Sequence, residues 1–182
     1  MKLIILDRDG VINEDSDDYI KSAEEWVAIP GSLEAIARLN LSNVKVAVAT
    51  NQSGIAREYF NINTLDLIHK KMEQSLARVG GRIDSIVYCP HGPDDGCQCR
   101  KPKAGMLYQI AEQFGCNLSG VYLIGDSLRD IQAAQAAGAQ GVLVKTGKGL
   151  RTLAANPTEL ENLPIFDDLS QAVDNLLNST LV

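Results

Sequence analysis

The chain alternates short, continuous apolar runs with longer segments in which apolar residues recur every three or four positions. The short runs are rich in valine and isoleucine, which is typical of strands buried on both faces. They cover residues 2–6, 44–50, 83–88, 121–125 and 141–145. The longer segments predict helices over 31–40, 64–80, 104–115 and 128–138, and several of these end at a glycine, a favoured residue after a helix.

Strand alternating with helix predicts right-handed crossovers and a mostly parallel sheet with helices on both faces. The expected fold class is therefore α/β, a Rossmann-like three-layer sandwich. From residue 149 the pattern predicts a loop, then a short strand at 165–166 and a closing helix over 169–178. No stretch is rich enough in proline, glycine or serine to act as a linker, so we expect one domain over residues 1–182.

The composition limits the partners. Seventeen basic residues against 23 acidic residues give a net charge of −6, and no basic stripe is available to bind nucleic acid. The opening segment is too short and too acidic for a signal peptide, and no apolar run is long enough to cross a membrane. We therefore expect a cytoplasmic protein with reduced thiols and no membrane partner. A monomer is expected because no large apolar stripe is evident.

Polar residues follow the predicted strands, and in open α/β sheets ligands bind beyond the carboxyl ends of the strands. Asp7 and Asp9 follow the first strand, and Asp126 follows another. Converging carboxylates repel one another unless a cation lies among them, and oxygen ligands of this kind suit Mg²⁺. Asp130 fits this site and fits equally well a helix-capping box with Ser127, so both interpretations stay open.

A second polar segment, "TNQSG" at 50–54, supplies a hydroxyl, amide groups and backbone N–H groups in a turn. This combination suits the oxygens of a phosphate group. Taken alone it is a weak signal, because such residues are common in loops. Its weight comes from its position directly after a predicted strand.

Three of the four cysteines and one of the two histidines lie close together, as Cys89, His91, Cys97 and Cys99. Three thiolates and an imidazole form a complete tetrahedral set for structural Zn²⁺. A disulfide and a catalytic Cys–His pair are the competing interpretations. The remaining cysteine, at position 116, is expected to be a core or surface thiol, and the histidine at position 69 a helix-face residue.

Four motifs carry a resemblance to a known family. "LDRDGVIN", "ATNQSG", "CRKP" and "GDSLRD" resemble, in order and in element type, the four motifs of the haloacid dehalogenase (HAD)-like phosphatases, and the resemblance covers about residues 2–147. The longer strings around them are similar to the subgroup that acts on heptose bisphosphate or on histidinol phosphate. A receiver-type signalling domain places its acidic pair and acceptor Asp differently, and an inactive zinc-stapled module leaves the ordered motifs unexplained.

The resemblance implies a Mg²⁺-dependent phosphatase that works through an aspartyl phosphate. The substrate would be D-glycero-D-manno-heptose 1,7-bisphosphate, losing its 7-phosphate on the way to nucleotide-activated heptose for lipopolysaccharide or glycoprotein. The alternative is histidinol phosphate, in histidine biosynthesis. The segment after the first strand, where this superfamily inserts specificity caps, is short here, so we expect a minimal cap and an open site.

The resemblance also implies roles for individual residues. Asp7 would be the nucleophile and Asp9 the general acid and base, and Thr50 and Lys101 would bind the phosphoryl oxygens. Mg²⁺ would lie between the Asp7 carboxylate, the Asp9 backbone carbonyl and the Asp126 carboxylate. The residues expected to bind substrate are Arg8, Asp15, Asp18, Tyr19, Asn51, Gln52, Ser53 and Arg100.

Arg100 and Lys101 follow the last candidate zinc ligand directly. A zinc ion that fixes the loop would therefore also fix the direction in which these two basic side chains point. This makes zinc a positioning device rather than a catalyst. It predicts that Cys99→Ser lowers activity by misplacing Lys101.

Overall fold

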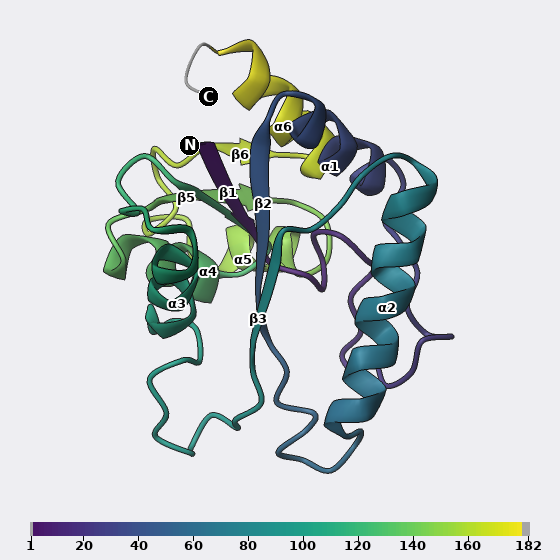
Figure 1. Cartoon of the computed structure of the whole chain (residues 1–182). Helices are drawn as coiled ribbons and strands as arrows, with labels where there is room; N and C mark the ends of the chain where they lie inside the picture. Colours follow the sequence, from purple (N-terminus) through teal and green to yellow (C-terminus); the bar gives the residue numbers. More distant parts are fainter. Residues whose placement is uncertain (1, 180–182) are drawn as a thin grey trace.

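The computed structural model describes residues 2–179, in which a six-stranded sheet has helices on both faces (Figure 1). The strands lie in the order β3-β2-β1-β4-β5-β6, and every pairing between them is parallel. The strands are β1 (Lys2–Leu6), β2 (Val44–Asn51), β3 (Ser85–Cys89), β4 (Tyr122–Gly125), β5 (Gln140–Val144) and β6 (Ile165–Phe166). The predicted parallel sheet is confirmed.

The helices form the two outer layers. They are α1 (Ser32–Leu41), α2 (Ile62–Arg78), α3 (Gly105–Phe114), α4 (Leu128–Ala136), α5 (Gly149–Ala155) and α6 (Leu169–Asn178). Helices α1, α2 and α6 lie on one face of the sheet, and α3 and α4 lie on the other (Figure 1). Their apolar residues form the two core clusters between helices and sheet. Alternate side chains of β1 point to opposite faces of the sheet: Ile4 and Leu6 belong to one core cluster, and Leu3 and Ile5 belong to the other. This is the expected three-layer sandwich.

The segment after residue 149 corrects the sequence prediction, which placed a loop there. The structure has helix α5, whose Leu153 packs against Ile131 and Leu143. Seven residues give too few turns for an apolar repeat to be visible in the sequence. The helix begins so close to β5 that only glycine fits at its first residue. A Cβ on Gly149 would lie 1.8 Å from the Val144 carbonyl oxygen.

The segment between β1 and α1 contains turns and isolated bridges and no helix, so the expected minimal cap is confirmed. Its bridges join Asn13 to Asp9 and to Ala28. Within residues 2–179, no helix combines the length and the apolar character needed to span a membrane.

The order of the strands determines where a ligand site can form. β1 lies between β2 and β4, so the chain leaves the sheet in opposite directions on the two sides of β1. Such a switch point opens a crevice at the carboxyl ends of the strands. Asp7 follows β1 at this crevice, and its backbone N–H donates to the carbonyl of Ile124 in β4 at 2.9 Å.

Candidate active site

A cavity of about 370 Å³ lies at the switch point, beyond the carboxyl ends of the strands. Most of the residues singled out from the sequence line it: Asp7, Asp9, Asp15, Tyr19, Thr50, Asn51, Ser53, Arg100, Lys101 and Asp126. The structure thus brings together the segments that the strand-end rule singled out. Besides Lys101, four basic residues line the cavity. Arg100 was expected from the sequence, whereas Arg57, Arg129 and Lys148 were not.

Three expected substrate-binding residues do not line this cavity: Arg8, Asp18 and Gln52. The Arg8 side chain is completely buried and pairs with Asp9. The Gln52 amide donates to Asp9 and to the hydroxyl oxygen of Thr50, at 3.0 and 2.9 Å. Both residues therefore contact the residues that line the cavity instead of facing the cavity itself. Asp18 is exposed on the adjacent loop.

Three carboxyl groups crowd together beside the cavity, and two of them, Asp7 and Asp126, line it. One oxygen from each of Asp7, Asp126 and Asp130 lies within 4.8 Å of the others. Burial, followed by the charges of neighbouring acids, raises the pKa of Asp7 to about 8 even though Lys101 opposes the shift. Burial and Asp130 likewise raise the pKa of Asp126 to about 7. A divalent cation would relieve this repulsion, so the donor set fits Mg²⁺.

Two glycines allow the backbone to approach the Asp126 carboxylate. A Cβ on Gly10 would lie 2.1 Å from Asp126 Oδ2, and one on Gly147 would lie 2.3 Å from the same atom. Both glycines have positive φ angles, of 81° and 56°. Any side chain at either position would push Asp126 out of place. The Lys148 backbone N–H donates to the same oxygen at 2.7 Å.

Lys101 joins the nucleophile candidate to Asp130. Its ammonium group lies 3.0 Å from Asp7 Oδ2 and 2.6 Å from Asp130 Oδ1, and it donates to the Ala49 carbonyl at 2.7 Å. The Asn51 side chain holds the Lys101 backbone at both polar atoms of its amide: Nδ2 donates to the Lys101 carbonyl at 3.1 Å, and Oδ1 accepts from the Lys101 backbone N–H at 3.0 Å. Although burial opposes it, the charges of Asp130 and Asp7 raise the pKa of Lys101, which stays a cation.

The capping-box interpretation of Asp130 is confirmed, and Asp130 has a second role. Its Oδ2 accepts from the backbone N–H of Ser127 at 3.1 Å and from the Ser127 hydroxyl at 2.6 Å. Its Oδ1 faces Lys101, as described above. Asp130 therefore caps α4 and anchors the lysine through different oxygens.

The Asp9 carboxylate is held by four donor atoms. Arg8 Nε and Asn13 Nδ2 donate to Oδ1 at 3.0 and 2.9 Å, and Arg8 Nη2 and Gln52 Nε2 donate to Oδ2 at 2.9 and 3.0 Å. Burial opposes ionisation, but the Arg8 charge and these hydrogen bonds lower the pKa of Asp9. The carboxylate of Asp9 is thus not part of the group that Asp7, Asp126 and Asp130 form.

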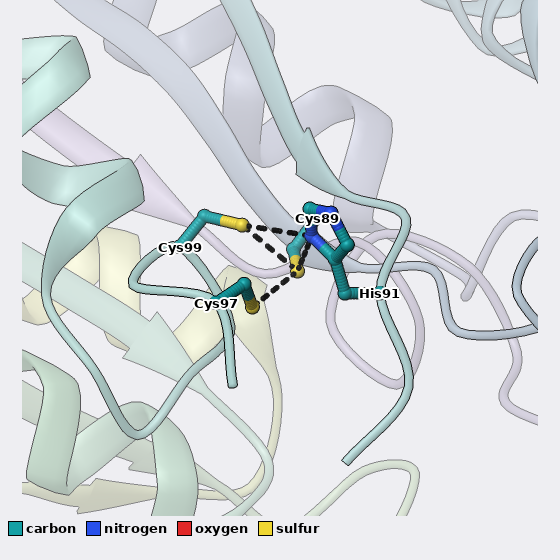
Figure 2. A group of neighbouring side chains, drawn as sticks. All are labelled: Cys89, His91, Cys97 and Cys99. Carbon is teal, nitrogen blue, oxygen red and sulfur yellow. Dashed lines mark hydrogen bonds between the residues drawn. The ribbon is translucent and has the colours of Figure 1, made fainter. Parts of the chain in front are cut away.

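The four zinc-ligand candidates converge at the end of β3 (Figure 2). Cys89 Sγ lies 3.1 Å from Cys99 Sγ, 3.7 Å from Cys97 Sγ and 3.5 Å from His91 Nδ1, and His91 Nδ1 lies 3.3 Å from Cys99 Sγ. A tetrahedral zinc site with bonds of about 2.0–2.3 Å has ligand–ligand edges of about 3.3–3.8 Å. The cluster therefore fits Zn²⁺, and no disulfide joins these cysteines.

Hydrogen bonds connect the zinc-candidate loop to the cavity. Arg100 Nη1 donates to the His91 carbonyl at 3.2 Å. The Gln52 backbone N–H donates to the Cys89 carbonyl at 2.8 Å. The loop thus contacts Arg100, which follows it, and the polar turn after β2. Cys116, as expected, lies outside the cluster, half-buried at the edge of the α3 and α4 core.

Ion pairs and a ring contact hold the loop at 15–19, which lines the cavity. Asp15 pairs with Lys148 at 2.5 Å, and Asp17 pairs with Arg151 at 3.0 Å. Tyr19 contacts Tyr59 with ring centroids 5.3 Å apart. Lys148 was missed in the sequence although it follows a predicted strand closely, so the strand-end rule applied to 145–149 would have found it.

The similarity of this chain to known proteins extends over nearly its whole length. The chain is 58% identical over 175 residues to the D-glycero-β-D-manno-heptose-1,7-bisphosphate 7-phosphatase of Pseudomonas aeruginosa, covering 96% of this chain and 97% of that one. It belongs to the heptose-1,7-bisphosphate phosphatase family. The resemblance inferred from the motifs is thereby confirmed, and the HAD-hydrolase-like family model matches residues 98–172.

Other heptose bisphosphate phosphatases agree. The Escherichia coli protein is 37% identical over 178 residues, covering 93% of this chain and 92% of its own. The crystal structure of the Bordetella bronchiseptica phosphatase, complexed with magnesium and phosphate, has a TM-score of 0.94 at 54% identity and covers 97% of this chain and 98% of its own. The Burkholderia thailandensis phosphatase has a TM-score of 0.78 at 45% identity, with coverage of 98% and 100%.

Proposed function

We propose that this protein removes the 7-phosphate of D-glycero-D-manno-heptose 1,7-bisphosphate, in the synthesis of nucleotide-activated heptose. The observation that carries the proposal is the placement of Asp7 at the switch point, 3.0 Å from Lys101 and grouped with Asp126. The identity to heptose bisphosphate phosphatases over nearly the whole chain supports the same substrate. The comparisons give no support to the histidinol phosphate alternative.

The chemistry follows from what the side chains can do. The Asp7 carboxylate attacks phosphorus, an Asp7–phosphate bond forms, and the bond to the sugar oxygen breaks. Asp9 would take up a proton in the complex and, in that protonated form, donate it to the leaving oxygen; as the carboxylate that results it would then remove a proton from the water that hydrolyses the aspartyl phosphate. Lys101 and Thr50 bind the oxygens of the transferring group, and Lys101 counters their negative charge.

Two metal ions fit the remaining donors. The Asp7 and Asp126 carboxylates, with the Asp9 backbone carbonyl, would hold Mg²⁺, which when bound neutralises charge on the phosphoryl group. Cys89, His91, Cys97 and Cys99 would hold a structural Zn²⁺ and leave no position open for catalysis.

The basic residues of the cavity support a bisphosphate rather than a monophosphate. Besides Lys101, the cavity is lined by Arg57, Arg100, Arg129 and Lys148. Lys148 pairs with Asp15, so the three arginines are the residues suited to a second phosphate at the far end of the sugar. Asp15 and Tyr19 line the same cavity and are placed to bind sugar hydroxyls.

The proposal is tested by measuring phosphate release from both anomers of the heptose 1,7-bisphosphate, from other sugar phosphates and from histidinol phosphate, each with Mg²⁺. We expect the heptose bisphosphate to give the highest kcat/KM. Turnover of histidinol phosphate alone, or of no substrate, would overturn the assignment. We further propose a cytoplasmic monomer, which size-exclusion chromatography with light scattering and cell fractionation would test.

A further inference from the structure

His69 lies in the middle of α2, where its side chain is almost fully buried. Its Nε2 atom lies 3.3 Å from Arg8 Nη1, and its ring contacts Tyr88. A guanidinium group only donates hydrogen bonds, so Nε2 must be the bare, accepting nitrogen and the ring proton must be on Nδ1. Burial and the Arg8 charge lower the pKa of His69 to about 4, in agreement with a neutral ring.

Arg8 connects this histidine to Asp9. Two nitrogens of the Arg8 guanidinium donate to the Asp9 carboxylate, at 3.0 and 2.9 Å, while the third faces His69. Arg8 and Asp9 are neighbours on an irregular segment, so contacts between them alone do not fix their orientation in the fold. His69 supplies an anchor from a long helix packed in the core.

We propose that His69 is a positioning residue for the phosphatase reaction: through Arg8 it fixes the orientation of the Asp9 carboxylate toward the leaving oxygen. Neither His69 nor Arg8 lines the cavity, so their effect must pass through Asp9. The inference rests on the proposed role of Asp9 as proton donor. It explains why an arginine expected to bind substrate is instead buried behind Asp9.

A residue that positions a proton donor can be told from one that only supports the fold, because its loss affects substrates differently according to their leaving group. A sugar oxygen is a poor leaving group and needs the proton, whereas p-nitrophenolate leaves readily without one. General acid catalysis contributes about 10²–10⁴-fold, and a misplaced group forfeits part of this. A defect that acts through Asp9 must therefore be much larger for a sugar phosphate than for p-nitrophenyl phosphate.

The experiment compares His69→Phe, which keeps a ring beside Tyr88 but has no acceptor, with His69→Gln, whose amide oxygen can accept from Arg8. We expect His69→Phe to lower kcat/KM for the heptose 1,7-bisphosphate about tenfold and that for p-nitrophenyl phosphate less than about threefold. We expect His69→Gln to restore most of the loss. Met72→Leu, at a fully buried position of α2, is the matched control and should change neither value.

Equal losses on both substrates, or no loss on either, would overturn the proposal. Thermal unfolding shows whether each variant is folded, and His69→Met, which also lacks a nitrogen acceptor, takes the place of His69→Phe if that variant does not fold. Failure of the proposed function gives a different result, because the unaltered protein would then release no phosphate from the heptose bisphosphate.

Discussion

Asp7 lies where two other carboxyl groups and one ammonium group meet. The oxygens of Asp126 and Asp130 lie within 4.8 Å of its own, and Lys101 faces it at 3.0 Å. Burial and the neighbouring acids raise the pKa of Asp7 to about 8, because the site disfavours a negative charge that no cation balances. The same arrangement suits a nucleophile that attacks phosphorus only once a cation and a phosphate group are in place.

Replacing Asp7 tests its role without removing the fold. Asp7→Asn keeps the shape of the side chain, and Lys101 keeps its contacts with Asp130 and Ala49. We expect kcat to fall at least about 1,000-fold, because an amide cannot take up the phosphoryl group. Phosphate release measures the rate, circular dichroism checks the fold, and mass spectrometry excludes deamidation to Asp. A folded variant with a near-normal rate would contradict the assignment.

Because the ring of His69 is neutral, the free energy of unfolding should depend on pH. The pKa of His69 is about 4 in the folded protein and 6.5 ordinarily. The unfolded chain therefore takes up the proton first, so the stabilisation is complete above pH 6.5 and is lost as the pH falls towards 4. The free energy of unfolding of the unaltered protein minus that of His69→Phe should therefore fall by about 3 kcal/mol between pH 7 and pH 4. Urea unfolding at both pH values, with Mg²⁺ present, measures this; a constant difference would show that His69 titrates normally.

At the scale of elements, the zinc-candidate loop controls Arg100 more directly than Lys101. Lys101 is anchored outside that loop, by Asn51, Ala49 and Asp130. Arg100 instead donates to the carbonyl of His91, a zinc-ligand candidate. The sequence predicted that losing zinc would misplace Lys101, and the structure shifts the expected effect to its neighbour.

Cys99→Ser should therefore release zinc and raise KM for the heptose bisphosphate about tenfold, with a smaller change in kcat. The physical reason is that Arg100 loses a fixed carbonyl partner while Lys101 keeps its own. Zinc content by mass spectrometry and steady-state kinetics give the two readouts. Cys116→Ser is the matched control, because that cysteine lies outside the cluster. Loss of zinc with unchanged kinetics would show that the loop holds its shape without the metal.

The elements also show what the sequence could and could not predict. The positions of Asp7, Thr50 and Asp126 followed from apolar strands ending in polar residues, because parallel strands bring their carboxyl ends to one edge. The contact between His69 and Arg8 joins residues 61 positions apart, and no local pattern links a helix face to a strand end. Helix α5 was missed because it is too short to show a repeat.

At the scale of the whole molecule, the crowded acids couple stability to pH and to Mg²⁺. The pKa values of Asp7, about 8, and Asp126, about 7, lie above the ordinary 3.8. The folded, metal-free protein thus binds more protons than the unfolded chain, and these two groups lower its stability as the pH rises from about 4 to 8. A cation that replaces those protons should remove the penalty, and its effect should grow with pH.

The corresponding experiment measures the rise in Tm caused by about 10 mM Mg²⁺, once at about pH 5.5 and once at about pH 8. We expect a clearly larger rise at pH 8, and Asp126→Asn should reduce it because one ligand charge is gone. Added NaCl of matched ionic strength controls for screening. Mg²⁺ is added to desalted protein instead of being removed by a chelator, which would also extract zinc. An equal rise at both pH values would mean that Mg²⁺ does not displace protons from Asp7 and Asp126.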